Sequence, residues 1–167
     1  LSINESNGVF TGSEATSLFG DTGNDLLRAG SGAERLFGGT GDDTVDGKRG
    51  NDVIEGGAGG DRVVFNGSNA AEKFEFSANG NRLRFVGAST MNIAGVERFD
   101  LRAFSGADNL VVNDLSGAGL GQLNAWNEAA IQDRAGRLAD QARTVWTAPR
   151  LDAVTLAAYQ PEKPTTA

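Results

Sequence analysis

The sequence of 167 residues contains no cysteine and no histidine. Without these residues the chain can form no disulfide, no thiolate nucleophile, no imidazole base and no Cys/His zinc site. A metalloprotease helix of the H-E-x-x-H type is excluded for the same reason. We therefore expect a protein that is not an enzyme, and we expect any bound metal ion to be held by oxygen atoms.

Basic residues and long apolar runs are also scarce. The chain has 15 Lys and Arg residues against 22 Asp and Glu residues, which gives a net charge of -7. Nucleic-acid binding needs clustered basic side chains, so cations are the more natural partners. The sequence has no stretch of eighteen apolar residues, and no transmembrane segment is predicted. Since the first residue is Leu1, we expect a piece of a larger product.

Glycine, by contrast, is abundant and regularly placed. Thirteen of the 24 glycines lie between residues 20 and 64, where the chain divides into blocks of nine that start at Thr11. The eighth position is always aliphatic, the sixth is acidic in five of six blocks, and glycine dominates the first, second and fourth. The blocks read TGSEATSLF, GDTGNDLLR, AGSGAERLF, GGTGDDTVD, GKRGNDVIE and GGAGGDRVV. An unbroken period of this kind indicates a solenoid.

Each block combines a six-residue turn with a three-residue strand. Glycine tolerates positive φ, so the turn can curl its carbonyl oxygens toward one point. An acidic side chain at position six would complete an all-oxygen cage of the kind that Ca²⁺ prefers. Strand side chains alternate between two faces, so the eighth positions should form the core. These residues are Leu18, Leu27, Leu36, Val45, Ile54 and Val63.

The blocks at 38–46 and 56–64 resemble the RTX, or haemolysin-type, calcium-binding nonapeptide G-G-x-G-x-D-x-U-x, and the resemblance covers about a third of the chain. It implies a parallel β-roll in which two nonapeptides make one full turn. It also implies calcium ions between blocks n and n+2 on each edge of the roll. The ligands would be backbone carbonyls of the first four positions and the position-six Asp.

The two edges of the expected roll differ in sequence. The even-numbered blocks carry Asp at position six, and we predict two calcium ions on this even edge, between turns 20–25 and 38–43 and between turns 38–43 and 56–61. The odd-numbered blocks carry Thr16, Glu34 and Asp52 at that position, with Lys48 and Arg49 where small residues are expected. On this odd edge we predict at most one weak ion, between turns 29–34 and 47–52. The candidate metal residues are Gly20, Thr22, Gly23, Asp25, Gly38, Gly39, Thr40, Gly41, Asp43, Gly57, Gly59 and Asp61, with Asp52 and Glu34 as weaker candidates.

Other kinds of site are poorly supported. An EF-hand loop starting at Asp42 would have Val53 at its twelfth position, where a bidentate Glu is needed. No dinucleotide or P-loop glycine motif is complete in the sequence. The neighbouring carboxylates of Asp42 and Asp43 should point apart, which argues against a glycosidase pair.

The sequence divides into four regions. They are an N-terminal lead-in (1–10), a calcium-binding β-roll (11–64), a capping β-region (65–120) and an Ala-rich tail that is helical or poorly ordered (121–167). The fold class is therefore mainly β, a parallel β-roll solenoid of nonapeptide repeats followed by capping strands with a hairpin and a short C-terminal helical segment.

Within the last two regions, several elements are predicted. Asn79-Gly80 is a type I′ turn pair, which would set Phe74 opposite Phe85, Glu75 opposite Arg84 and Phe76 opposite Leu83. Further strands are expected at 96–104 and 108–115, and SGADNLVV at 105–112 looks like a decayed repeat. Apolar residues at helical spacing predict a helix near 125–146.

The predicted function is calcium binding by an RTX-type repeat module of a secreted, extracellular bacterial protein that folds on binding external calcium. Residues 11–64 hold ten acidic and five basic side chains, a net charge of -5, and this repulsion disfavours folding without a cation. That the protein is secreted, and folds only when it meets calcium outside the cell, is implied by the resemblance alone. One alternative is a calcium-rigidified polysaccharide-binding or adhesin module with a cell-surface partner, which an exposed row of aromatic residues would favour. Another is a β-helix enzyme acting on carbohydrate, whose catalytic domain would lie outside this piece.

Overall fold

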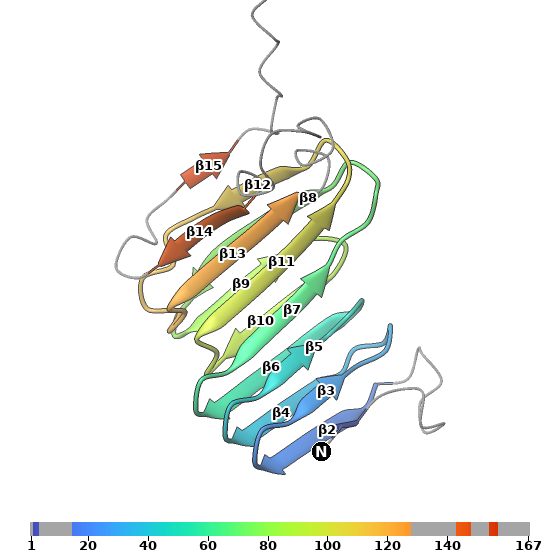
Figure 1. The fold of residues 1–167 in the computed structure, drawn as a ribbon, viewed down its shortest axis with the longest axis vertical. Coiled ribbons are helices and arrows are strands. Elements are labelled where there is room, and N and C mark those ends of the chain that lie inside the picture. Colours follow the sequence, from blue (N-terminus) through green and yellow to red (C-terminus); the bar gives the residue numbers. More distant parts are fainter. Residues whose placement is uncertain (1, 4–14, 128–142, 148–153, 157–167) are drawn as a thin grey trace, which may run out of the picture.

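The computed structural model describes residues 2–3, 15–127, 143–147 and 154–156. Every regular element in these residues is a β-strand, so the mainly β class is confirmed. The strands are stacked along the long axis of the molecule in two sheets (Figure 1). No helix of the described residues is long and apolar enough to cross a bilayer.

The strands up to the end of the repeats are β1 (Ser2–Ile3), β2 (Ser17–Thr22), β3 (Leu26–Arg28), β4 (Arg35–Thr40), β5 (Thr44–Asp46), β6 (Asn51–Ala58) and β7 (Arg62–Asn66). The strands that follow are β8 (Lys73–Asn79), β9 (Arg82–Val86), β10 (Thr90–Ala94), β11 (Arg98–Phe104), β12 (Asn109–Val112), β13 (Gln122–Asn127), β14 (Arg143–Thr147) and β15 (Val154–Leu156). One sheet has seven strands in the order β1-β3-β5-β7-β11-β13-β14. The other has eight strands in the order β15-β12-β8-β9-β10-β6-β4-β2.

Two nonapeptides make one turn of the solenoid. Strands β2, β4 and β6 are parallel neighbours in the eight-stranded sheet, with Leu18 beside Leu36 and Leu36 beside Ile54. Strands β3, β5 and β7 are parallel neighbours in the seven-stranded sheet. Each neighbour is eighteen residues further along the chain, which is the arrangement expected of a parallel β-roll.

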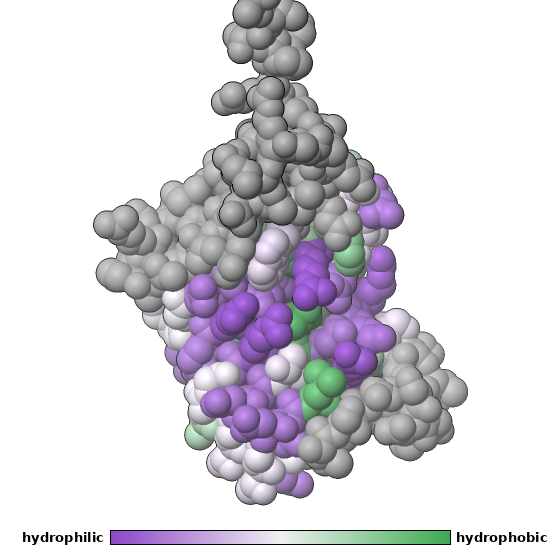
Figure 2. All heavy atoms as spheres, in the orientation of Figure 1, coloured by the Kyte–Doolittle hydropathy of each residue, from purple (hydrophilic) through white to green (hydrophobic). Residues whose placement is uncertain are grey.

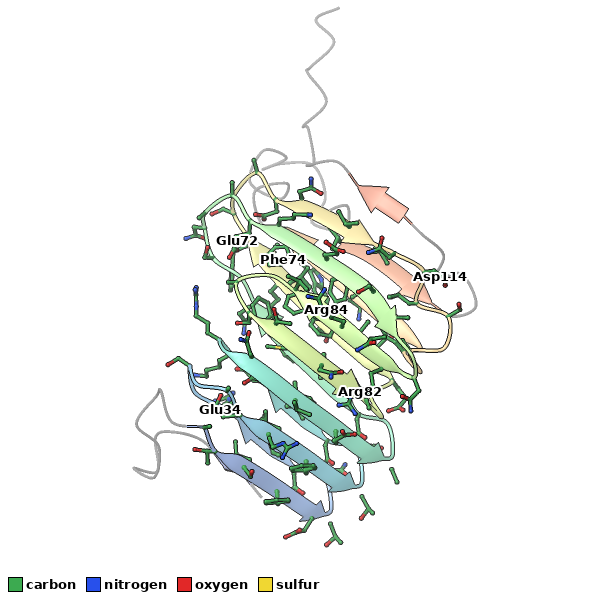
Figure 3. All side chains as sticks on the ribbon, turned by 180° about the vertical axis from the view of Figure 1, so that it is seen from behind. Glu34, Glu72, Phe74, Arg82, Arg84 and Asp114 are labelled. Carbon is green, nitrogen blue, oxygen red and sulfur yellow. The ribbon has the colours of Figure 1, made fainter. Side chains whose placement is uncertain are left out.

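The core lies between the two sheets. All six eighth-position residues of the blocks are buried, as the period predicts. Towards the C-terminal side the aliphatic core passes into a group of fully buried phenylalanines, whose rings contact one another. These are Phe65, Phe74, Phe76, Phe85 and Phe99, and Figure 3 shows Phe74 among them between the strands. On the face drawn in Figure 2, polar side chains cover most of the described surface.

Residues 65–127 extend both sheets of the roll. Strand β10 is parallel to β6, and β11 is parallel to β7 with Phe99 beside Val63. Strand β13 then adds to β11, also in parallel. The expected strands at 96–104 and 108–115 correspond to β11 and β12, whereas β10 was not predicted from the sequence.

The β8–β9 hairpin forms, but with a different register from the one expected. Gly80 and Asn81 make the turn, and of the two only Gly80 has a positive φ (65°), which is the type II′ pattern rather than type I′. Phe76 is therefore opposite Phe85, and Arg84 is opposite Ser77. The expected cross-strand pair of Glu75 and Arg84 is wrong. The buried face is kept because a shift of two residues preserves the alternation of faces.

The expected helix near 125–146 is wrong at both ends. Residues 125–127 belong to β13, and residues 143–146 belong to β14, which pairs with β13 in the antiparallel direction. Residues 128–142 lie outside the described residues. Pairing of β13 on both sides supplies ladder hydrogen bonds, and such tertiary contacts override the helical spacing of the sequence.

Candidate metal centre

The even edge consists of the three turns 20–25, 38–43 and 56–61, which connect strands of the eight-stranded sheet to strands of the other. These turns share one backbone conformation, with left-handed residues at positions two and four. Position two has φ values of 72° at Asp21, 114° at Gly39 and 117° at Gly57, and position four has 103° at Gly23, 121° at Gly41 and 144° at Gly59. Glycine permits this conformation, and Asp tolerates it at position 21.

One oxygen of each position-six aspartate ties neighbouring turns together. The backbone N–H of Asp25 donates to Oδ1 of Asp43, and that of Asp43 donates to Oδ1 of Asp61, both at 2.8 Å. All three aspartates are buried. These hydrogen bonds satisfy a buried backbone donor in each of the first two turns and hold the position-six carboxylates in a column along the edge.

The second oxygen of these carboxylates has a different environment. Oδ2 of Asp43 and Oδ2 of Asp61 are buried and make no hydrogen bond. Burying an ionised carboxylate oxygen without a partner is costly, so such atoms are normally paired or bound to a metal. These unpartnered oxygens are therefore candidate ligands for a cation.

These oxygens converge with backbone carbonyls over the first glycine of each turn. A Cβ added to Gly38 would collide with both Oδ2 of Asp43 and the carbonyl oxygen of Gly56. A Cβ added to Gly20 would collide with the carbonyl oxygen of Gly38 and lie 2.7 Å from Oδ2 of Asp25. Each buried glycine thus leaves open a small cradle lined by one carboxylate and one carbonyl oxygen. These are the ligand types that Ca²⁺ takes, and they fit it.

The cradles depend on backbone oxygens more than on clustered side chains. Among the residues that the structure describes, no three His, Cys, Asp or Glu side chains gather around one point. Further carbonyls face along the edge, because a Cβ on Gly41 or Gly59 would collide with the carbonyl oxygen of Gly23 or Gly41. The carbonyls of Thr40 and Ala58 accept hydrogen bonds from the turn before, at 2.8 Å each.

Position five forms a second, outer ladder that the sequence did not reveal. The N–H of Asp42 donates to Oδ1 of Asn24, and the N–H of Gly60 donates to Oδ1 of Asp42, both at 2.8 Å. Asp42 is exposed whereas Asp43 is buried. The two neighbouring carboxylates therefore point apart, as expected.

The predicted even-edge residues are brought together on one edge, though at different depths. Gly20, Gly38 and the three aspartates are buried, Gly39 and Gly41 are half-buried, and Thr22, Gly23, Thr40, Gly57 and Gly59 are exposed. Gly56 was missing from the predicted set although its carbonyl lines the Gly38 cradle. Its place at position one of a block was the signal that could have found it.

The family model for RTX calcium-binding nonapeptide repeats (4 copies) matches residues 10–45 and 37–69. Residues 10–69 are RTX calcium-binding nonapeptide repeats. This match makes Ca²⁺ the expected ion for the even-edge cradles. The comparisons with curated proteins and with solved structures gave no match.

The electrostatics of the RTX repeats also favour a cation on the even edge. Burial raises the pKa of Asp61, and the negative charges of Asp43, Glu97 and Asp42 raise it further. A bound divalent cation would offset both effects, because it stabilises the ionised carboxylate.

The odd edge of the RTX repeats is built differently. The N–H of Glu34 donates to Oδ1 of Asp52 at 2.9 Å, which repeats the even-edge contact. The space beside Gly47, however, is bounded by the methyl group of Met91 (3.0 Å) and Oδ2 of Asp52 (3.1 Å), with no carbonyl oxygen among the three nearest atoms. Burial raises the pKa of Asp52 to about 7, and the neighbouring Glu34 carboxylate contributes. The odd edge therefore also buries a costly carboxylate, but the space beside it is bounded by a methyl group where the even edge has a carbonyl oxygen.

The decayed repeat at 105–112 keeps one RTX contact. The N–H of Glu72 donates to Oδ1 of Asp108 at 2.9 Å, as between position-six residues of stacked blocks. Gly106 has a φ of 137°, and a Cβ there would lie 2.5 Å from the carbonyl oxygen of Ala70. Glu72 and Glu34 lie toward the same edge of the molecule in Figure 3. The resemblance of this segment to a repeat thus has a structural counterpart.

The aromatic residues give no support to a polysaccharide-binding face. Phe74, Phe76 and Phe85 are fully buried. Phe19 is the one large apolar side chain exposed among the described residues, at 52%, and its ring stacks on Phe37 with centroids 4.9 Å apart. A stacked pair does not make the exposed row that this alternative needs.

Proposed function

We propose that the chain binds Ca²⁺ along the even edge of its RTX repeats and that this binding drives folding of the roll. The observation that supports the proposal is the pair of buried, unpartnered oxygens, Oδ2 of Asp43 and Oδ2 of Asp61. The first shares the Gly38 cradle with the carbonyl of Gly56. One ion is assigned between turns 20–25 and 38–43 and another between 38–43 and 56–61, with at most one weak ion on the odd edge.

Calcium binding should be coupled to folding because the folded roll stacks buried carboxylates. Asp25, Asp43 and Asp61 are buried one above another in the turns of a segment with a net charge of -5. Without a cation these carboxylates repel one another and lack solvation. An ion that binds only the folded roll stabilises it by mass action, by about 2.7 kcal/mol at a hundred times the dissociation constant.

The biological setting we propose is a secreted bacterial protein. In the cytosol, where calcium is scarce, the repeats would stay unfolded for export, and external calcium would fold them. We assign residues 65–120 the role of closing the roll, since β10 and β11 pair with β6 and β7 and leave neither of those edges open. The repeats themselves carry a structural role and no catalytic one.

Far-UV circular dichroism of the full chain tests the coupling. We expect the β-sheet signal to appear when Ca²⁺ is added to chelator-treated protein and to be lost again with excess chelator. Mg²⁺ at the same concentration serves as the control and should restore little of the signal, because it demands tighter octahedral geometry. A spectrum that is the same with calcium and with chelator would contradict the proposal.

A further inference from the structure

We propose a third calcium position on the even edge, between the turn 56–61 and the short connection Gly95–Glu97, beyond the residues that match the RTX repeats. The inference rests on the proposed function, since it extends the same edge by one ion. The residues that support it are Glu97, Gly95 and Asp61, and all three belong to the part of the chain that the structure describes.

The chain reaches this edge through β10. After the β8–β9 hairpin, β10 returns in parallel alongside β6, with Ile93 beside Ile54 and Ala94 beside Glu55. Residues 95–97 then cross to β11, which starts beside β7 with Arg98 opposite Arg62. The connection therefore lies over the turn 56–61, where a further repeat would otherwise lie.

The hydrogen bonds at this level repeat those of the level below. The N–H of Asp61 donates to Oε2 of Glu97 at 2.7 Å, as the N–H of Asp43 donates to Oδ1 of Asp61. The N–H of Arg98 donates to the carbonyl of Asp61 at 3.0 Å, as that of Arg62 donates to the carbonyl of Asp43 at 2.8 Å. Glu97 thus takes the structural role of a position-six aspartate.

The same kind of cradle is present over Gly56. A Cβ added to Gly56 would collide with the carbonyl oxygen of Gly95 and lie 2.7 Å from Oδ2 of Asp61. Asp61 is fully buried, and its Oδ2 has no hydrogen-bond partner. The carbonyl of Gly95 accepts one hydrogen bond, from the N–H of Gly57 at 3.2 Å, and a carbonyl has a second lone pair to offer. The cradle over Gly56 therefore has the same two kinds of oxygen as the one over Gly38, a position-six Oδ2 and a backbone carbonyl oxygen.

The sequence supports this assignment independently. Counting in nines from Thr11, residues 92–100 read NIAGVERFD, with Gly95 at position four, Glu97 at six and the core residue Phe99 at eight. A carboxylate oxygen and a carbonyl oxygen at one point suit a hard divalent cation of the size of Ca²⁺. Four carboxylates, those of Asp25, Asp43, Asp61 and Glu97, then follow one another along the edge, with the proposed ions between them.

Native mass spectrometry of the full chain in calcium provides the test. We expect Glu97→Gln to bind one ion fewer than the wild type, because Gln keeps an acceptor for the N–H of Asp61 but loses the charge. The matched control is Glu75→Gln, which changes the same charge on β8, where Glu75 contacts Lys73 and Asn113 rather than the edge. The control should bind as many ions as the wild type.

The outcomes separate this proposal from the proposed function. If the wild type binds calcium and Glu97→Gln binds the same number of ions with the same affinity, the third position is wrong while the repeat sites stand. If the wild type binds none, the proposed function itself fails. Should Glu97→Gln not fold, a calcium-soaked crystal of the wild type decides. Density between Gly56, Asp61 and Gly95 supports the proposal, and density in the repeat cradles alone overturns it.

Discussion

At the scale of single residues, the position-six aspartates Asp43 and Asp61 of the RTX repeats each contact the neighbouring turn through one oxygen and line a cradle with the other. Through Oδ1, Asp43 accepts the buried N–H of Asp25. Its Oδ2 lies in the Gly38 cradle without a hydrogen-bond partner. A single side chain thus links the hydrogen-bond ladder to the proposed metal sites.

Replacing Asp43 should be the most damaging single change to calcium binding. Asp43→Ala removes the carboxylate oxygen that lies in the Gly38 cradle and strands the buried N–H of Asp25, which bonds to the other oxygen. Loss of a charged hydrogen-bonding group costs about 1.5–3 kcal/mol, so we expect the apparent calcium affinity to fall about 10- to 100-fold. Asp52→Ala, on the odd edge, is the matched comparison and should reduce affinity much less. Equal losses in calcium titrations would show that the two edges do not differ.

The glycine cradles can be filled without changing charge. Gly38→Ala would place a methyl group against Oδ2 of Asp43 and the carbonyl of Gly56, so we expect calcium binding and stability both to be lost. Gly60→Ala is the control on the same edge, since its nearest contact is Oδ1 of Asp42 at 3.3 Å. This variant should change the midpoint of urea unfolding only slightly. Normal calcium binding by Gly38→Ala would refute the position of the cradle.

At the scale of elements, strand β11 is held to both of its neighbours by one buried carboxylate. Asp100 accepts hydrogen bonds from Arg62 of β7 (2.5 Å), from Arg98 of its own strand (2.9 Å) and from Asn124 of β13 (2.5 Å). Burial alone would raise the pKa of Asp100. The donors from Arg98, Asn124 and Arg62 outweigh burial and hold it below its usual range.

This network should make stability depend on pH in the acid range. Because the pKa of Asp100 is lowered in the folded state, its contribution is complete above the unfolded value of about 3.9 and is lost as pH falls through the lower folded pKa. We expect Asp100→Asn to destabilise the protein by about 2 kcal/mol at pH 7, less than the roughly 3–5 kcal/mol of a fully buried pair. Arg62 and Arg98 are partly exposed, which screens them.

Urea unfolding of the wild type and of Asp100→Asn across pH 2–7 measures this difference directly. The gap in unfolding free energy between the two proteins should close below about pH 4. A gap that stays constant down to pH 2 would mean that Asp100 contributes nothing through its charge.

The sequence predicted the repeat elements better than those after residue 65. The aliphatic residues from Leu18 to Val63 are spaced nine apart, and this period alone predicts where the strands lie and which side chains form the core. The β8–β9 hairpin was harder, because both Asn79-Gly80 and Gly80-Asn81 can form a two-residue turn. The structure has the Gly80-Asn81 turn, which brings Phe76 opposite Phe85 in the core. The helical spacing near 125–146 is misleading because it says nothing of the strands β11 and β14 that pair with β13.

At the scale of the whole molecule, the repeat pattern in the sequence predicts only part of the candidate site. The asymmetry between the edges follows from block parity, and Met91 beside Gly47 adds a cause that no pattern within the repeats contains. Gly95 and Glu97 come to the even edge only because β10 returns alongside β6 after the hairpin. Such long-range pairing is a property of the fold, so the residues it brings to the edge had to be found in the structure.

The central claim is that calcium binds the even edge and folds the roll, and calorimetric titration of the full chain tests it most directly. We predict saturable binding of at least two Ca²⁺ ions, with a large negative heat-capacity change from the apolar surface that the roll buries as it folds. The absence of binding heat, or binding with no heat-capacity change, would contradict the account.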